Sequence, residues 1–90
     1  MGATADAMRL KLQRGLTPEK LEIIDRSDRH AGHAGAREGG ESHFDVTVVA
    51  AAFTGLGKVQ RQRLVYSLLA EELAGPVHAL SLVARAPGEG

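Results

Sequence analysis

SHFDVTVV, residues 42–49, is the stretch that decides the fold, because large apolar side chains occupy every second position in its centre. Alternation with a period of two is typical of a strand that buries one face. The side chains expected on the buried face are Phe44, Val46 and Val48. His43 and Asp45 would lie on the opposite face, so the sequence predicts a sheet with one face packed against a core.

Upstream of this strand the sequence predicts a helix, a strand and an exposed loop. Apolar residues recur at spacings of three and four over 5–14, which predicts an amphipathic helix that ends at Gly15. Residues 21–27 are partly β-branched and favour a strand. The stretch 28–40 is rich in glycine and poor in large apolar residues, so we expect a loop there.

Downstream, residues 58–74 carry the longest helical pattern. The apolar side chains expected on its buried arc are Val59, Val65, Tyr66, Leu69 and Leu73. Gly75 and Pro76 are expected to end this helix, with Gly75 as a left-handed cap. Residues 77–84 predict a third strand, and 88–90 a disordered C-terminal tail.

The order helix, strand, strand, helix, strand predicts a single α+β domain over residues 1–87, with helices on one face of a three-stranded mixed sheet. Strands one and two should be antiparallel because a loop joins them. The long helix between strands two and three allows a parallel, right-handed crossover.

Composition narrows the classes of function. The chain has 90 residues, enough for one small core, and 11 basic against 11 acidic residues, so no overall excess of charge favours a polyanion. Cys is absent, which excludes disulfides, cysteine nucleophiles and an iron–sulfur cluster held by thiolates of this chain alone. No apolar run is long enough to cross a membrane, and we expect a cytoplasmic protein with no membrane partner.

Histidine is the metal-binding side chain that remains. His30 and His33 lie in the glycine-rich loop, and His78 lies just before the third strand. Neutral imidazole is a suitable ligand for iron, zinc or copper. Spacing alone leaves open whether these histidines bind metal or are ordinary loop and junction residues.

No arrangement of side chains indicates an enzyme. Ser42, His43 and Asp45 contain the residue types of a hydrolytic triad, but strand alternation puts Ser42 on the other face from His43 and Asp45. A separate basic group, Lys58, Arg61 and Arg63, opens the long helix and could bind phosphate or simply be solvated.

Four ordered blocks of sequence carry a family resemblance. They are Glu41-Ser42-His43-Phe44, Phe53-Thr54-Gly55, Val59-x-Arg61-x-Arg63-Leu64-Val65-Tyr66, and Glu72-Leu73 followed by Val77-His78-Ala79-Leu80. Together they resemble the BolA family over about residues 8–87. One departure is Gln62, where the family usually has His between the two arginines. Gln62 is expected on the buried arc of the helix. We expect the change from His to Gln to have little effect on the cluster binding that the resemblance implies.

The resemblance implies a fold similar to class II KH domains and a monothiol glutaredoxin as partner. In the family the two proteins share a [2Fe–2S] cluster, with the sulfur ligands supplied by the glutaredoxin and glutathione and none bound to the isolated chain. The histidine of the Val-His-Ala-Leu block is a cluster ligand, which here is His78. A second ligand comes from the loop between strands one and two. We favour His33 over His30 because it lies nearer the middle of that loop.

Three functions therefore stay open. The first is an iron–sulfur adaptor for cluster trafficking or iron regulation, monomeric or weakly dimeric when alone. The second is a DNA-binding transcriptional regulator that uses Lys58, Arg61 and Arg63, although the Gly-x-x-Gly loop of KH domains is missing. The third is a protein–protein module whose histidines never bind metal.

Overall fold

The computed structural model describes residues 3–26 and 43–89. Its elements follow the predicted order. They are α1 (Ala3–Leu16), β1 (Lys20–Asp25), β2 (His43–Val49), the 3₁₀ turn η2 (Ala51–Phe53), α2 (Lys58–Leu68), α3 (Ala70–Ala74) and β3 (Ala79–Arg85). Among these described helices, none has the length and apolar character needed to cross a membrane.

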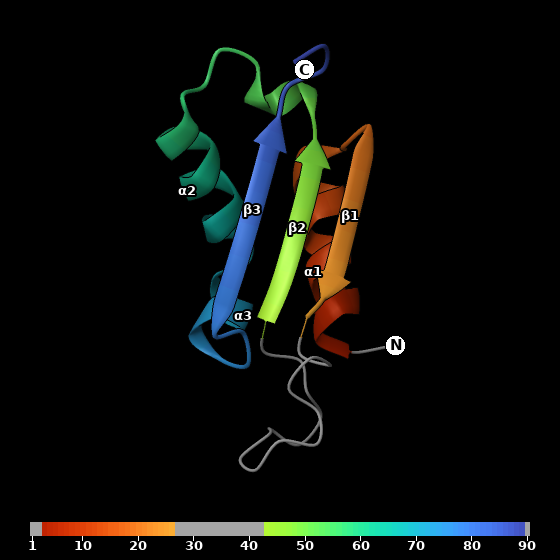
Figure 1. Cartoon of the computed structure of the whole chain (residues 1–90), viewed down its shortest axis with the longest axis vertical. Coiled ribbons are helices and arrows are strands. Elements are labelled where there is room, and N and C mark those ends of the chain that lie inside the picture. The colour runs from red at the N-terminus through yellow and green to blue at the C-terminus, as the bar shows by residue number, and fades with distance from the viewer. Residues whose placement is uncertain (1–2, 27–42, 90) are drawn as a thin grey trace.

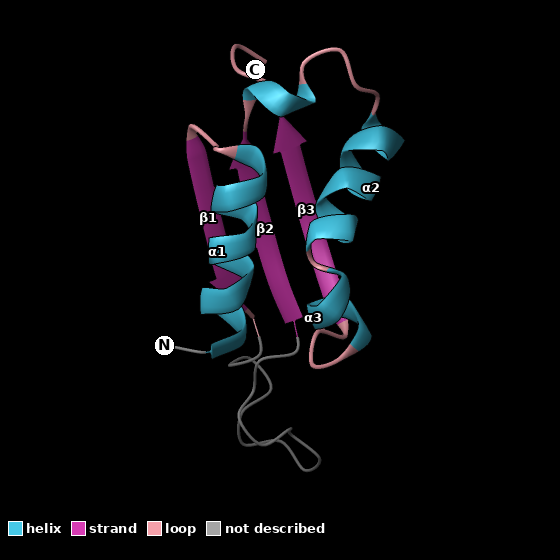
Figure 2. Cartoon of the chain, turned by 180° about the vertical axis from the view of Figure 1, so that it is seen from behind, coloured by secondary structure: helices cyan, strands magenta, loops and turns pink. Residues whose placement is uncertain are grey.

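The three strands form one mixed sheet in the order β1-β2-β3 (Figure 1). β1 pairs with β2 antiparallel, and Ile23 lies opposite Val46. β2 pairs with β3 parallel, and Val46 lies opposite Leu82. Seen from behind, the helices cover one face of the sheet, with α1 over β1 and β2 and with α2 beside β3 (Figure 2). The predicted α+β class, strand directions and single helical layer are confirmed.

The core lies between this helical layer and the inner face of the sheet. Burial alternates strictly along β2, as the sequence predicted, so every second side chain enters the core. The fully buried large side chains are Phe44, Val46 and Val48 from β2, Met8 and Leu12 from α1, Phe53 from η2, Val65 from α2, and Leu69. All three expected core residues of β2 are therefore confirmed.

α1 is longer than predicted, because Gly15 lies inside the helix. A Cβ atom at Gly15 would come within 2.7 Å of the Leu68 side chain, so this glycine permits close packing against the end of α2. The helix instead ends at Leu16, and Thr17 follows with a positive φ of 45°. Pro18 comes next and cannot continue a helix.

The predicted helix over 58–74 is interrupted at Leu69, which separates α2 from α3. Val65 and Leu69 are fully buried, and Tyr66 and Leu73 pack on the edge of the core. Val59 is 59% exposed, so its assignment to the buried arc was wrong. Gln62 is also exposed rather than on that arc. Both residues lie in the first turns of α2, where the helix extends beyond the core.

The ends of several elements differ from the prediction. Gly75 is not a left-handed cap, since its φ is −114°. The α3 end is instead satisfied by the backbone N–H of Val77, which donates to the carbonyl of Glu72. β1 ends at Asp25 rather than 27, and β3 covers Ala79–Arg85 rather than 77–84.

The C-terminal segment is held against the domain. The sequence prediction placed Glu89 in a disordered tail, whereas its carboxylate accepts hydrogen bonds from Arg61 and from the backbone N–H of Ala86. Arg61 lies 28 positions earlier in the chain, so the interaction could not be seen in the local sequence.

Candidate functional site

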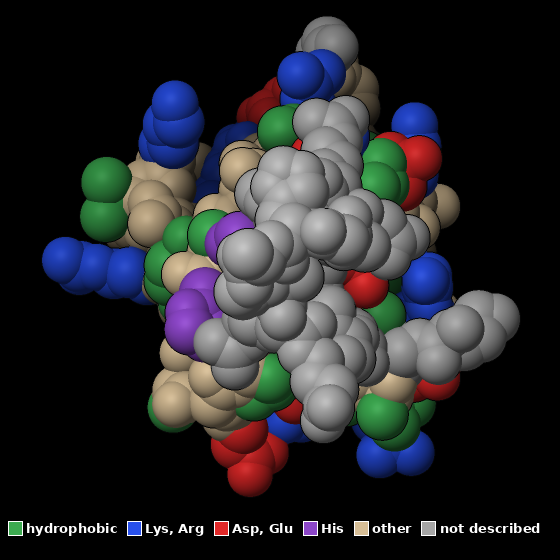
Figure 3. Space-filling model, turned by 60° about the horizontal axis from the view of Figure 1, so that its bottom comes forward, with side chains coloured by type: hydrophobic (Ala, Val, Ile, Leu, Met, Phe, Trp, Pro, Cys, Tyr) green, Lys and Arg blue, Asp and Glu red, His purple; other side chains and the backbone are tan. Residues whose placement is uncertain are grey.

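One end of the sheet gathers the described histidines. His43 is the first residue of β2, and His78 directly precedes β3. Because His43 lies opposite Ala79 in the parallel ladder, His43 is close to the residue that comes just before Ala79, which is His78. They appear as the two purple groups on this end of the molecule in Figure 3. The His78 side chain is exposed, and that of His43 is half-buried.

The backbone explains why His78 is placed there. Val77 is 4% exposed and anchors the chain in the core between α3 and β3. The next side chain emerges at the end of the sheet, before the strand ladder begins at Ala79. A rigid anchor followed by an exposed imidazole is an arrangement that can present a ligand to something outside the chain.

His30 and His33 lie outside the described residues. The two residues that flank their segment are described: the backbone N–H of Arg26 donates to the carbonyl of His43 over 2.7 Å. The segment therefore leaves and re-enters the sheet at the end where His78 lies. The structure brings the attachment points of the predicted loop ligands to the site of the predicted strand ligand, and it does not test the histidines themselves.

His43 is the residue that the sequence reasoning missed as a member of this group. It was interpreted as a strand residue of the open face, and its nearness to His78 depends on the parallel register between β2 and β3. A signal was present, since a residue at the start of one strand and a residue before the start of its parallel neighbour meet at one edge. Within the described ranges 3–26 and 43–89, no three His, Asp or Glu side chains converge to hold a metal ion.

The basic group at the start of α2 is not a uniform cationic surface. Lys58 and Arg63 are exposed, whereas Arg61 is half-buried, with a side chain that is 15% exposed. Its guanidinium donates to Glu89 over 2.6 and 2.7 Å, to the carbonyl of Leu56 over 2.9 Å and to the carbonyl of Ala84 over 3.1 Å. The same group lies 6.0 Å from the centre of the Phe53 ring. Arg61 therefore joins α2, β3 and the C-terminal segment.

The contacts of Arg61 change the pKa of Glu89. Hydrogen bonds from Arg61, and then from the backbone of Ala86, lower the pKa of Glu89 from 4.5 to about 2. These bonds favour the charged carboxylate over its protonated form. Arg61 and Glu89 are therefore a mutually neutralised pair, and the three predicted phosphate-binding cations are reduced to Lys58 and Arg63.

At the N-terminus of α2, one backbone N–H group is already engaged in a hydrogen bond within the protein. The N–H of Gly57 donates to the Gln60 side chain over 2.8 Å. Gly55 has a positive φ of 83°, which permits the turn before the helix, but the turn lacks the spacing of a phosphate-binding loop. The geometry here favours a stabilised helix start more than an anion site.

Comparison with known proteins identifies relatives over most of the chain. The family profile described as BolA-like protein matches residues 12–89. BolA-like protein 1 of Homo sapiens is 47% identical over 89 residues, which cover 99% of this chain and 62% of that protein. The protein from Vibrio cholerae described as DNA-binding transcriptional regulator BolA is 46% identical over 77 residues, which cover 86% of this chain and 69% of that protein.

The fold has a close counterpart among solved structures. BolA1 from Arabidopsis thaliana superimposes with a TM-score of 0.86 at 50% sequence identity, covering 96% of this chain and 94% of that one. The chain nevertheless spans only about three fifths of the length of BolA-like protein 1 relatives such as the human one, at 62%. The shared fold therefore accounts for only part of those longer proteins.

Proposed function

The chain belongs to the BolA-like protein family, and on this premise we propose that it is a non-catalytic iron–sulfur adaptor. It binds a monothiol glutaredoxin and shares a [2Fe–2S] cluster with it, for cluster trafficking or iron regulation. His78 supplies one ligand, and the segment that contains His30 and His33 supplies the second, with His33 favoured. The glutaredoxin and glutathione supply the thiolates.

The observation that carries the proposal is the exposed position of His78 at the sheet end where the loop segment is attached. A chain without Cys can offer imidazole nitrogen but no thiolate, so a complete ligand set requires a second molecule. The bound cluster would supply electron-transfer and iron–sulfur donor chemistry, while this chain binds and orients it.

Reconstitution tests the ligand assignment. The protein is mixed with a monothiol glutaredoxin, iron, sulfide and glutathione, and the heterodimer is isolated by size exclusion. We expect a visible spectrum different from that of the glutaredoxin homodimer, because imidazole replaces a sulfur ligand. His78→Ala and His33→Ala should each remove the difference, whereas His30→Ala should preserve it.

His43→Ala is the matched comparison, because it removes an imidazole from the same end of the sheet. An unchanged spectrum in this variant supports the loop histidine as second ligand. If His43→Ala abolishes the difference and both loop variants preserve it, the second ligand is His43. An unchanged spectrum in His78→Ala contradicts the proposal. Equal glutaredoxin affinity without iron, and after removal of both loop histidines, would favour a metal-free interaction module.

A DNA-binding regulator is the second candidate, favoured by the similarity to the Vibrio cholerae protein that is described as a DNA-binding transcriptional regulator. Of the three predicted cations, Lys58 and Arg63 are exposed and could contact phosphate, since Arg61 is engaged with Glu89. A DNA titration at two salt concentrations tests it. Affinity that falls with salt and with Lys58→Ala and Arg63→Ala would support this function, and no binding at low salt would remove it.

A further inference from the structure

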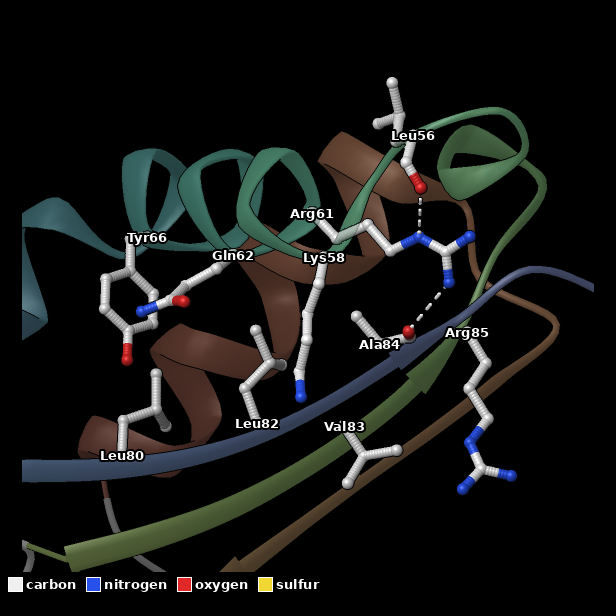
Figure 4. A pocket seen from close by; sticks show the side chains of 10 residues that line it. All are labelled: Leu56, Lys58, Arg61, Gln62, Tyr66, Leu80, Leu82, Val83, Ala84 and Arg85. Carbon is white, nitrogen blue, oxygen red and sulfur yellow. Dashed lines mark hydrogen bonds between the residues drawn. The ribbon is translucent and has the colours of Figure 1, made fainter. Parts of the chain in front are cut away.

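A groove between α2 and β3 is a feature that the proposed function does not use. It has a volume of about 670 Å³. Figure 4 shows the helix forming one side and the outermost strand of the sheet forming the other. Lys58, Gln62 and Tyr66 reach into it from α2, and Leu80 and Leu82 reach into it from β3.

The backbone of β3 presents its outer edge to this groove. β3 is the last strand of the sheet, with β2 on its other side. The carbonyl of Arg85 accepts the N–H of Ala50 on the β2 side, and the carbonyl of Ala84 accepts Arg61 on the α2 side. Because successive residues of a strand point to opposite edges, Leu80 and Leu82 direct their N–H and C=O groups outward like Ala84.

The side chains along this edge do not prevent strand pairing. From Ala79 to Ala84 the strand has no charged residue, no proline and no glycine. Proteins usually protect an open edge with charges, proline or a bulge, because unpaired backbone groups recruit another strand. Leu80 and Leu82 are half-buried at the rim of the core, and Val83 is 41% exposed on the other face. An added strand would therefore find apolar contacts on both of its faces.

The charge of the groove selects the occupant. Every charged side chain that lines it is basic, namely Lys58, Arg61 and Arg85. Glu89 binds Arg61 and also interacts with the charge of Arg85, and the three cations still outnumber this one carboxylate at the end where β3 finishes. A strand that fits must therefore combine apolar residues along Leu80 and Leu82 with carboxylates beside Lys58 and Arg85.

We propose that the outer edge of β3 and the facing side of α2 bind an extended, acidic peptide segment of another protein, which adds a fourth strand to the sheet. Main-chain hydrogen bonds to Leu80 and Leu82 supply affinity, and Lys58 and Arg85 select carboxylates at one end of the segment. Arg61 occupies the carbonyl of Ala84, so it limits how far the added strand can run.

The test uses two blocked synthetic peptides in which alternating Val and Thr residues are preceded or followed by three acidic residues. The two orders cover parallel and antiparallel addition. Each peptide carries a fluorescent label, and its binding to the protein is measured by fluorescence anisotropy. Neither iron nor glutaredoxin is present, so the result is independent of the proposed cluster. We expect one of the two peptides to bind, and the bound state to slow hydrogen exchange of the Leu80 and Leu82 amides by about ten-fold or more.

Two variants of the groove and one control variant make the test specific. Lys58→Glu should weaken binding about five-fold or more, whereas Arg9→Glu makes the same charge change on exposed α1 and should alter it by less than about two-fold. Ala84→Pro removes a backbone N–H that points outward from β3. Edge strands tolerate proline at such positions, and the substitution should also weaken binding. Circular dichroism of each variant shows whether the fold is retained, and Lys58→Glu decides the question if Ala84→Pro does not fold.

Several outcomes would overturn the proposal. Binding that leaves the Leu80 and Leu82 amides unprotected would place the peptide elsewhere. Protection of those amides by concentrating the protein alone would identify the occupant as a second copy of this chain. A single-stranded oligonucleotide that binds with the same Lys58 dependence, while neither peptide binds, would make the groove a nucleic-acid surface.

Discussion

The two outer strands of the sheet differ in how their edges are protected. β1 carries charged side chains at three of its six positions, Lys20, Glu22 and Asp25. β3 carries one in seven residues, Arg85, at its last position. Both strands pair with the same central strand and cover the same core, so burial alone does not explain the difference.

By this difference the β1 edge should disfavour further pairing, whereas the β3 edge should permit it. Charged residues on an edge strand oppose the approach of a second strand, because they would have to lose water. At β3 the corresponding protection is confined to the end, where Arg61 of α2 occupies the carbonyl of Ala84. The following predictions test this difference, beginning with the largest effect.

The two edges can be compared directly only if β1 and β3 unfold together in one cooperative step. Leu69→Ala tests whether they do. Leu69 is fully buried in the core between the helices and the sheet. Removing its side chain should lower the free energy of unfolding by about 2–5 kcal/mol. Urea denaturation measures the loss, and hydrogen exchange should show the slowest amides of β1 and β3 accelerated by the same factor.

Leu10→Ala is the matched control for this prediction. Leu10 is 47% exposed on α1, so the same substitution should change stability by less than about 1 kcal/mol. If Leu69→Ala accelerates exchange in β3 but not in β1, the two edges unfold separately, and their difference would not reflect protection within one sheet.

Removing two of the three charges of β1 should give it the behaviour expected of a less protected edge. The double variant Lys20→Val, Glu22→Val leaves the net charge unchanged, so any new association cannot come from lower charge repulsion between molecules. We expect self-association to strengthen about ten-fold or more, equivalent to about 1.4 kcal/mol. Sedimentation velocity over a range of concentrations measures it.

The control for this variant is Asp6→Val with Arg9→Val, which also preserves net charge and replaces two exposed side chains of α1. This pair should associate no more than the wild type. Equal association of both double variants would mean that exposed valines in general, and not an opened edge, cause the effect.

The sequence was sufficient where the pattern is local and periodic. The alternation of β2 predicted its inner face, and the connection lengths predicted antiparallel and parallel pairing. Spacing also placed Val65 and Leu69 in the core correctly. In each case a strand or helix period reports directly on which side is buried.

The sequence failed where a contact joins distant residues. Gly15 was interpreted as a helix end because glycine is a common terminator, but Leu68 packs against it. Glu89 was assigned to a disordered tail, although Arg61 binds it. At the histidine end, the position of His78 could be predicted, whereas the nearness of His43 required the register of β3. His30 and His33 remain predictions.

Glu89→Gln tests how the end of the β3 edge is closed. The folded-state pKa of Glu89 is lowered to about 2 from 4.5, so the unfolded chain binds the proton more readily between these values. The stabilisation from Glu89 is therefore present above about pH 4.5 and is lost as the pH falls toward about 2. The variant should melt below the wild type at neutral pH, and the gap should shrink across this window.

Glu22→Gln is the control, because it also removes one exposed carboxylate, on β1. Its difference from the wild type should stay smaller than that of Glu89→Gln at neutral pH. If the difference in melting temperature between Glu89→Gln and the wild type stays constant from neutral pH to about pH 2, the charge of Glu89 does not stabilise its contact with Arg61.

The smallest effect is expected at the open face of the sheet, where Arg26 follows β1 and donates from Nε to Asp45 of β2 over 2.6 Å. Both side chains are about one-third exposed, at 33% and 36%, so water and salt screen the pair. A double-mutant cycle with Arg26→Ala and Asp45→Ala should give a coupling of about 0.2–1 kcal/mol that falls at high salt. A coupling well above this range would mean that an ion pair fixes the end of β1. A small coupling leaves the strand ladder and the buried side chains as what holds β1 in place, and its charges as protection of the edge.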